Sequence, residues 1–160
     1  MMFQTSHYSG TKQEQYSLVT KQLEALAAGE LNQIANLSNA SALLGQFLGR
    51  INWVGFYLND GNELVLGPFQ GLPACVRIPF GKGVCGTVAA QQKTLRVADV
   101  HEFPGHIACD AASRSEIVVP LLKDGNLIGV LDIDSPEVNR FDEEDEAGLT
   151  HFADMLVRFL

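Results

Sequence analysis

The sequence predicts an α+β domain with about six mostly antiparallel strands, and with N- and C-terminal helices packed on one side of the sheet. Three observations support this prediction. Apolar residues recur at helical spacing in two N-terminal segments and one C-terminal segment. Alternating apolar strands lie between them, and two Asp-Gly turns there favour β-hairpins. The 160 residues, 46% of them hydrophobic, are enough for one core, so a single domain is expected.

The N-terminal part is predicted to be helical. Residues 1–10 are expected to be a flexible terminus, and residues 11–160 to form the domain. Helices are predicted over 11–29, ended by Gly29, and over 30–48. Ser38 and Asn39 are candidates to interrupt the second helix, because both residue types favour caps and turns.

A hairpin is predicted next, with strands at 51–58 and 63–69 around Asp60-Gly61. Alternation places Trp53, Gly55 and Tyr57 on one face of the first strand. Two aromatic residues around a glycine could wall a gap for a ligand, because glycine leaves its position empty. The two aromatic residues could instead simply cover a helix, and spacing alone favours this second interpretation.

A glycine-rich run follows the short strand predicted at 76–79. Residues 80–91 lack the spacing of a nucleotide phosphate loop. A glycine-rich turn that enters a helix still presents free backbone N–H groups to an anion. Cys85 is predicted near that helix start, where the helix dipole would lower its thiol pKa. The alternative is an ordinary loop whose small residues allow close packing.

A 17-residue connection, residues 99–115, follows a strand predicted at 95–98. Loops of this length in compact domains are usually functional or disordered. Its apolar residues argue against disorder, and it carries Cys109, two histidines and an arginine. A surface loop packed by its own side chains is the other interpretation.

Two further strands are predicted at 116–122 and 126–134, joined by Asp124-Gly125. On the last strand, alternation places Ile128, Val130, Asp132 and Asp134 on one face. Two carboxylates beside apolar neighbours are costly to bury unless they bind something, although solvation at a sheet edge would also explain them. The final helix is predicted to begin at Asp142, a favourable N-cap residue.

Composition excludes several classes of function. The net charge is −8 and the pI is near 4.8, which argues against general binding to nucleic acid phosphates. No apolar run approaches the ~20 residues of a membrane span, and no signal peptide is visible, so a cytoplasmic protein without membrane association is expected. Three cysteines then indicate reactive or buried thiols. No cofactor is expected, and no metal, since common zinc spacings are absent.

The segment Asn139–Glu146, Asn-Arg-Phe-Asp-Glu-Glu-Asp-Glu, resembles the signature of GAF domains. Five further segments resemble the free methionine-(R)-sulfoxide reductases, a group built on that domain. They are residues 51–57, 66–71, 80–86, 103–116 and 131–136. The segment around Cys109, Phe-Pro-Gly-His-Ile-Ala-Cys-Asp-Ala-Ala-Ser-Arg-Ser-Glu, is the most specific of them.

The resemblance implies a function and a set of cysteine roles. The family reduces the R epimer of free methionine sulfoxide and not sulfoxide within proteins. By this resemblance, Cys109 attacks the sulfoxide sulfur, Cys75 resolves the resulting sulfenic acid as a disulfide, and Cys85 assists binding or recycling. Thioredoxin is the implied reductant, and a homodimer is a possible assembly.

The resemblance also implies a substrate pocket. Residues that match those lining it are Trp53, Tyr57, Glu116, Asp132 and Asp134. The chemistry of the residues agrees in kind. Carboxylates bind the ammonium group of an amino acid, and backbone N–H groups near 83–86 can bind its carboxylate. The departing oxygen needs a proton, for which Asp134 is the candidate donor.

Two other classes of function remain open. One is a GAF module that senses a small molecule without catalysis. The other is a thiol-based metal or redox sensor that uses Cys75, Cys85, Cys109, His101 or His106. Reduction of separated epimers would distinguish the first, and a zinc assay the second.

Overall fold

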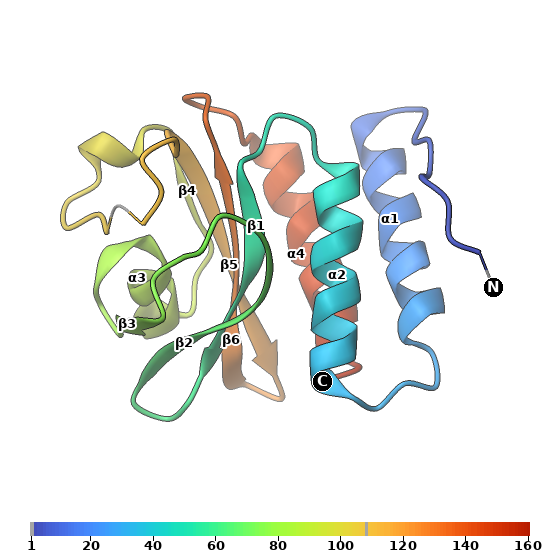
Figure 1. Cartoon of the computed structure of the whole chain (residues 1–160), viewed down its shortest axis with the longest axis horizontal. Coiled ribbons are helices and arrows are strands. Elements are labelled where there is room, and N and C mark those ends of the chain that lie inside the picture. The colour runs from blue at the N-terminus through green and yellow to red at the C-terminus, as the bar shows by residue number, and fades with distance from the viewer. Residues whose placement is uncertain (1, 108) are drawn as a thin grey trace.

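The computed structural model describes residues 2–107 and 109–160, and within them an antiparallel sheet of six strands lies between two helical layers (Figure 1). The strand order is β3-β2-β1-β6-β5-β4. The strands are β1 (Trp53–Asn59), β2 (Glu63–Gly71), β3 (Arg77–Pro79), β4 (Leu95–Val97), β5 (Ser115–Lys123) and β6 (Asn126–Ser135). The predicted fold class is therefore confirmed.

Within the described residues, three α-helices lie on one side of the sheet, two of them against the strands and the N-terminal one packed outside those two, and a fourth lies on the other side (Figure 1). The three are α1 (Lys12–Ala27), α2 (Gln33–Phe47) and α4 (Glu143–Val157), and the fourth is α3 (Gly83–Gln91). Val54 and Phe56 of β1 join the core under the three helices, whereas Trp53 and Tyr57 face α3. The alternation predicted for this strand is confirmed.

Local signals in the sequence set the ends of the elements. Asp142 caps α4 and forms a capping box with Asp145, as its position predicted. Asp124 and Gly125 both have positive φ, 52° and 79°, which suits the tight turn between β5 and β6. In the other hairpin, the Asp60 side chain accepts hydrogen bonds from backbone N–H groups at positions 62 and 63.

Two predictions about individual residues were wrong. Helix α2 is continuous through Ser38 and Asn39, because both side chains point to solvent and do not compete for the buried backbone. Ile128 does not share a face with Val130. The pairing of β5 with β6 shifts register at Leu121/Leu122, so the extra residue in β6 places Ile128 against the core of the three-helix face.

None of the helices formed by the described residues is long and apolar enough to cross a membrane.

Candidate functional site

A small pocket lies on the α3 face of the sheet, where the central strands meet the start of α3 and the loop that precedes β5. Its cavity volume is about 50 Å³. The residues that line it come from β1, the β2–β3 loop, β3, α3, the 99–114 loop, β5 and β6. They are Trp53, Tyr57, Leu72, Pro73, Ala74, Ile78, Lys82, Gly83, Val84, Cys85, His106, Ile107, Cys109, Asp110, Ser113, Glu116, Asp132 and Asp134.

A disulfide joins Cys75 to Cys109 beside this pocket, with 5.7 Å between the two Cα atoms. Cys75 belongs to the β2–β3 loop, and Cys109 to the loop before β5. The two loops therefore meet at the pocket, and the redox state of one bond controls whether they are tied together.

The connection before β5 has the predicted length but runs over residues 98–114, because β4 ends at Val97 and Ser115 already belongs to β5. It opens with a short 3₁₀ turn, Val100–Glu102, and Val100 is fully buried. Gly83 explains how the loop lies so close to α3. Its φ is 62°, and a Cβ there would stand 3.2 Å from Ile107. The loop lines the pocket and also forms backbone hydrogen bonds within itself, such as that from Phe103 N–H to the Val100 carbonyl.

The aromatic wall is made by β1 and β2. Trp53 stacks on Tyr57 and on Phe69, with ring centroids 5.9 and 5.2 Å apart. The Tyr57 hydroxyl donates to the carbonyl of Cys75 at 2.9 Å, which ties the wall to the disulfide loop. There is no gap at Gly55: a Cβ there would lie 2.3 Å from the Cβ of Phe69 and 2.9 Å from the Trp53 ring, so these residues occupy the space. The interpretation that spacing favoured, in which the aromatic residues cover a helix, agrees with their packing against α3.

The acidic residues lie beside this wall on the same face of the sheet, since Trp53 of β1 pairs with Asp134 of β6. Glu116 and Asp132 are buried, with 5% and 6% of their surface exposed, and Asp134 is partly buried. Because β5 and β6 are interior strands of the sheet, solvation at a sheet edge does not explain these acids. Burial, together with the charge of Asp132, raises the pKa of Glu116 and of Asp134 well above the usual range. Burial also raises the pKa of Asp132.

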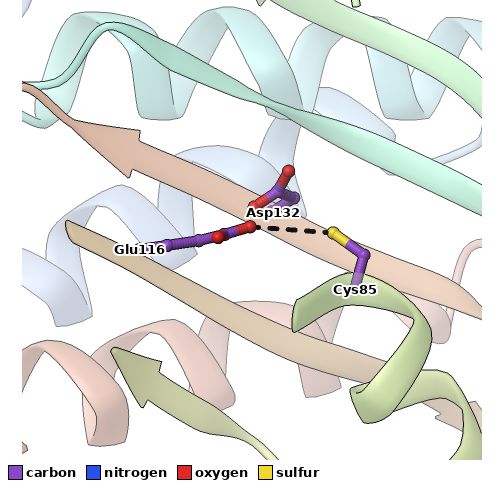
Figure 2. Close-up of side chains that lie close together, drawn as sticks. All are labelled: Cys85, Glu116 and Asp132. Carbon is purple, nitrogen blue, oxygen red and sulfur yellow. Dashed lines mark hydrogen bonds between the residues drawn. The ribbon is translucent and has the colours of Figure 1, made fainter. Parts of the chain in front are cut away.

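Cys85 closes the floor of the pocket from α3 (Figure 2). Its Sγ lies 3.9 Å from Oε1 of Glu116. The prediction of a lowered thiol pKa was wrong. Burial raises the pKa of Cys85, and the charges of Asp132 and Glu116 add to this, so they outweigh the helix dipole. Sequence reasoning considered the helix start alone and did not place the acids of β5 and β6 next to it.

The comparisons with known proteins agree with this geometry. The family model for the GAF domain matches residues 23–158. The free methionine-R-sulfoxide reductase of Escherichia coli (strain K12) is 54% identical over 149 residues, which are 93% of this chain and 90% of that protein. This chain belongs to the GAF domain family and, within it, to the free methionine-R-sulfoxide reductases.

Two further relatives extend the comparison. Protein YtsP of Bacillus subtilis (strain 168) is 60% identical over 99% of both chains. The X-ray structure of free methionine-R-sulfoxide reductase from Neisseria meningitidis in complex with its substrate superposes with a TM-score of 0.91 at 48% identity. It covers 98% of this chain and 95% of that one. By family, therefore, the chain is an oxidoreductase.

The structure of this reductase brings together the eight site residues that the resemblance named, since each either lines the pocket or takes part in its disulfide. Of the two histidines considered for a sensor, His106 lines the pocket and His101 does not. Sequence reasoning missed Asn52. Its amide donates to Asp110 at 2.9 Å and to Ser113 at 3.1 Å, and so holds the Cys109 loop against β1. A polar residue directly before Trp53 was the available signal.

Proposed function

We propose that this protein reduces free L-methionine (R)-S-oxide to methionine by thiol chemistry. The observation that carries the proposal is the disulfide between Cys75 and Cys109 beside a pocket with an aromatic wall and an acidic floor. Each chemical group of an amino acid sulfoxide has a complementary group in this pocket. The ammonium group suits the carboxylates, and the methylthio end suits the Trp53 ring.

The substrate carboxylate is assigned to the start of α3. Among the described residues, no side chain caps this helix, and Gly83 and Val84 line the pocket. Unpaired N–H groups at a helix start favour an anion. Charges at both ends of the pocket select a whole zwitterion, because a peptide-linked residue has neither charge and would leave the polar groups unpaired.

The proposed reaction has two steps. The Cys109 thiolate attacks the sulfoxide sulfur, and with one proton the oxygen passes to Cys109 as a sulfenic acid while methionine leaves. The Cys75 thiol then attacks that sulfenic acid, forming the disulfide and releasing water. Asp134 is the proposed proton donor, which requires a carboxylic acid that stays protonated near neutral pH.

The disulfide form then corresponds to the end of this half-reaction. In this form Cys109 has no thiolate, so the disulfide must be reduced before the next turnover. We propose thioredoxin as the reductant, because a disulfide of this kind needs a dithiol donor for each turnover. We propose the cytoplasm as the compartment. A homodimer stays a prediction.

The test uses separated R and S epimers of free methionine sulfoxide, together with N-acetylated, C-amidated methionine sulfoxide as a model of a peptide residue. Methionine formation is measured with dithiothreitol as the reductant. Turnover is expected with the free R epimer and at least 100-fold less with the S epimer and the blocked compound. Equal rates on the blocked compound would contradict the zwitterion pocket, and absence of turnover would favour a sensor that does not catalyse.

A further inference from the structure

Three groups that commonly bind metals converge on the pocket floor from three separate elements. They are the thiol of Cys85 on α3 and the carboxylates of Glu116 on β5 and Asp132 on β6 (Figure 2). Their ligand atoms all lie within 4.8 Å of one another, and all three residues are buried. Because α3 packs against both strands, this arrangement is part of the fold and not of a surface loop.

A second observation concerns the hydrogen bonding of Asp132. Asp132 is 6% exposed, and within residues 2–107 and 109–160 no hydrogen-bond donor reaches its buried Oδ1 atom. A buried carboxylate oxygen without a donor costs free energy, and a cation that binds it removes that cost. When the neighbouring Cys85 and Glu116 lose their protons, their negative charges add to the attraction of Asp132 for a cation.

The distance between two of these ligand atoms is compatible with a tetrahedral ion. With Zn–S near 2.3 Å and Zn–O near 2.1 Å, the 3.9 Å between Cys85 Sγ and Glu116 Oε1 corresponds to an S–Zn–O angle of about 125°. A thiolate with two carboxylates favours zinc over magnesium or calcium, which prefer oxygen ligands alone. His106 is a further ligand type at hand, with its Nε2 4.0 Å from Glu116 Oε2.

We propose that Cys85, Glu116 and Asp132 form a binding site for one Zn²⁺ ion, and that the ion excludes the substrate from the pocket. Binding is an exchange without redox chemistry: the Cys85 S–H proton leaves to solvent as the Zn–S bond forms. The binding site stands on the geometry alone. Only its inhibitory effect rests on the proposed reductase function, since the ion and the substrate ammonium would occupy the same acidic floor.

The disulfide form of the protein makes the decisive test possible. The chain has three cysteines and two of them are joined, so Cys85 supplies the single thiol. The test uses oxidised protein in which one thiol per chain reacts after unfolding. The folded protein is titrated with Co²⁺, a spectroscopic substitute for zinc. We expect one equivalent to bind, with a thiolate-to-cobalt charge-transfer band and tetrahedral visible bands, and Zn²⁺ to displace it. Absence of the band would overturn the proposal.

Variants then locate the ion. Cys85→Ser should abolish the charge-transfer band. Glu116→Gln keeps the thiol and should weaken Co²⁺ binding at least tenfold, which covers the case in which the cysteine variant does not fold. The matched control is Asp110→Asn, an acid of the same pocket outside the cluster, whose affinity should stay within about twofold of the parent. A band that survives in Cys85→Ser, or an equal loss in Asp110→Asn, would contradict the site.

A separate measurement reports on inhibition. Prereduced protein, freed of reductant, is given the free R sulfoxide with and without one equivalent of Zn²⁺, and methionine per chain is counted. We expect zinc to suppress this single turnover at least tenfold. If the protein gives the cobalt band but shows no turnover, the proposed reductase function is refuted and the metal site stands. If turnover occurs, zinc does not affect it and no cobalt band appears, the metal site alone is refuted.

Discussion

Asp145 of α4 lies on the three-helix side of the fold and Glu116 in the pocket on the side of α3, and both side chains are almost completely buried. Asp145 accepts hydrogen bonds from Tyr16 at 2.7 Å, from Lys12 at 2.8 Å and from the backbone of Asp142 at 2.9 Å, and it pairs with Arg140. Such a carboxylate is held by the fold and serves stability.

The acids on the α3 side have a different environment. Glu116 faces Cys85 and the other pocket acids, and burial raises its pKa instead of a cation stabilising its charge. When a buried acid has no cation to stabilise its charge, the free-energy cost of burying the acid is usually offset by a function. The two faces therefore show how one sheet can support a stable core on one side and a reactive, ligand-binding pocket on the other.

The largest effect should come from the cysteines of the pocket. Cys109→Ser should form no methionine, even in a single turnover, because the nucleophile is gone. Cys75→Ser should release about one methionine per chain and then stop as a sulfenic acid, which dimedone traps. Mass spectrometry of parent protein treated with substrate should find Cys75 bonded to Cys109. A bond between Cys75 and Cys85, with Cys109 reduced, would show that the nucleophile is misassigned.

Glu116→Gln should separate activity from stability. The substitution keeps the size of the side chain and removes its charge and proton, so kcat/KM for the free R sulfoxide should fall by about 100-fold. The melting temperature should stay within ~2 °C, because burial, which raises the pKa of Glu116, already disfavours its charged form, so the fold does not depend on that charge. The matched control is Glu102→Gln, an exposed acid of the nearby loop, which should retain the parent's kinetics. An inactive variant that also melts far below the parent would mean that Glu116 belongs to the core.

Asp145→Asn should give the opposite result. Loss of the charge leaves Arg140 buried without its partner, and the amide nitrogen faces donors, so the free energy of unfolding should fall by about 3 kcal/mol. Urea unfolding measures this, and kcat/KM per folded chain should not change. Glu146→Gln, on the same helix as Asp145, removes a partly exposed pair with Arg96 of β4 and should cost less than about 1 kcal/mol. Similar losses in both variants would contradict the view that Asp145 anchors this face.

The sequence predicted these two faces unequally well. Periodicity, capping residues and Asp-Gly turns are local signals, so the order of the elements, the face of Trp53 and the cap at Asp142 followed from them. The thiol pKa of Cys85 did not, because it depends on Asp132 and Glu116, which lie 47 and 31 residues along the chain and approach only through sheet pairing. The prediction for the face of Ile128 was wrong for a related reason, since a register shift between β5 and β6 has no signature within the sequence of one strand.

The cysteine roles came from a family resemblance and not from the residues themselves. Nothing in the spacing of Cys75 and Cys109 indicates a bond, because the two loops that carry them are joined through three other elements. The structure adds the 5.7 Å Cα separation and the hydrogen bond from Tyr57 to the Cys75 carbonyl. Long-range proximity of this kind requires the sheet order, which the sequence patterns did not supply.

The smallest effect should come from Asp142, at the edge of the three-helix face. Partial burial opposes its ionisation, but hydrogen bonds from Lys12 and from the Asp145 backbone outweigh this and lower its pKa to about 2. A carboxyl whose pKa is lower in the folded state stabilises the fold above its unfolded pKa, near 3.9, and loses that contribution as the pH falls towards 2.

Asp142→Ala should therefore cost about 1 kcal/mol at pH 7, as other lost N-caps do, and lower the melting temperature by ~2–4 °C. The difference between parent and variant should shrink when the pH is lowered from 5 towards 2, because the parent then loses the charge of Asp142 as well. Thermal unfolding at several pH values measures both trends. Asp154→Ala, which removes an exposed acid from the same helix, is the control and should leave the melting temperature nearly unchanged throughout. A gap between parent and Asp142→Ala that stays constant down to pH 2 would show that the capping geometry, and not the charge of Asp142, stabilises this face.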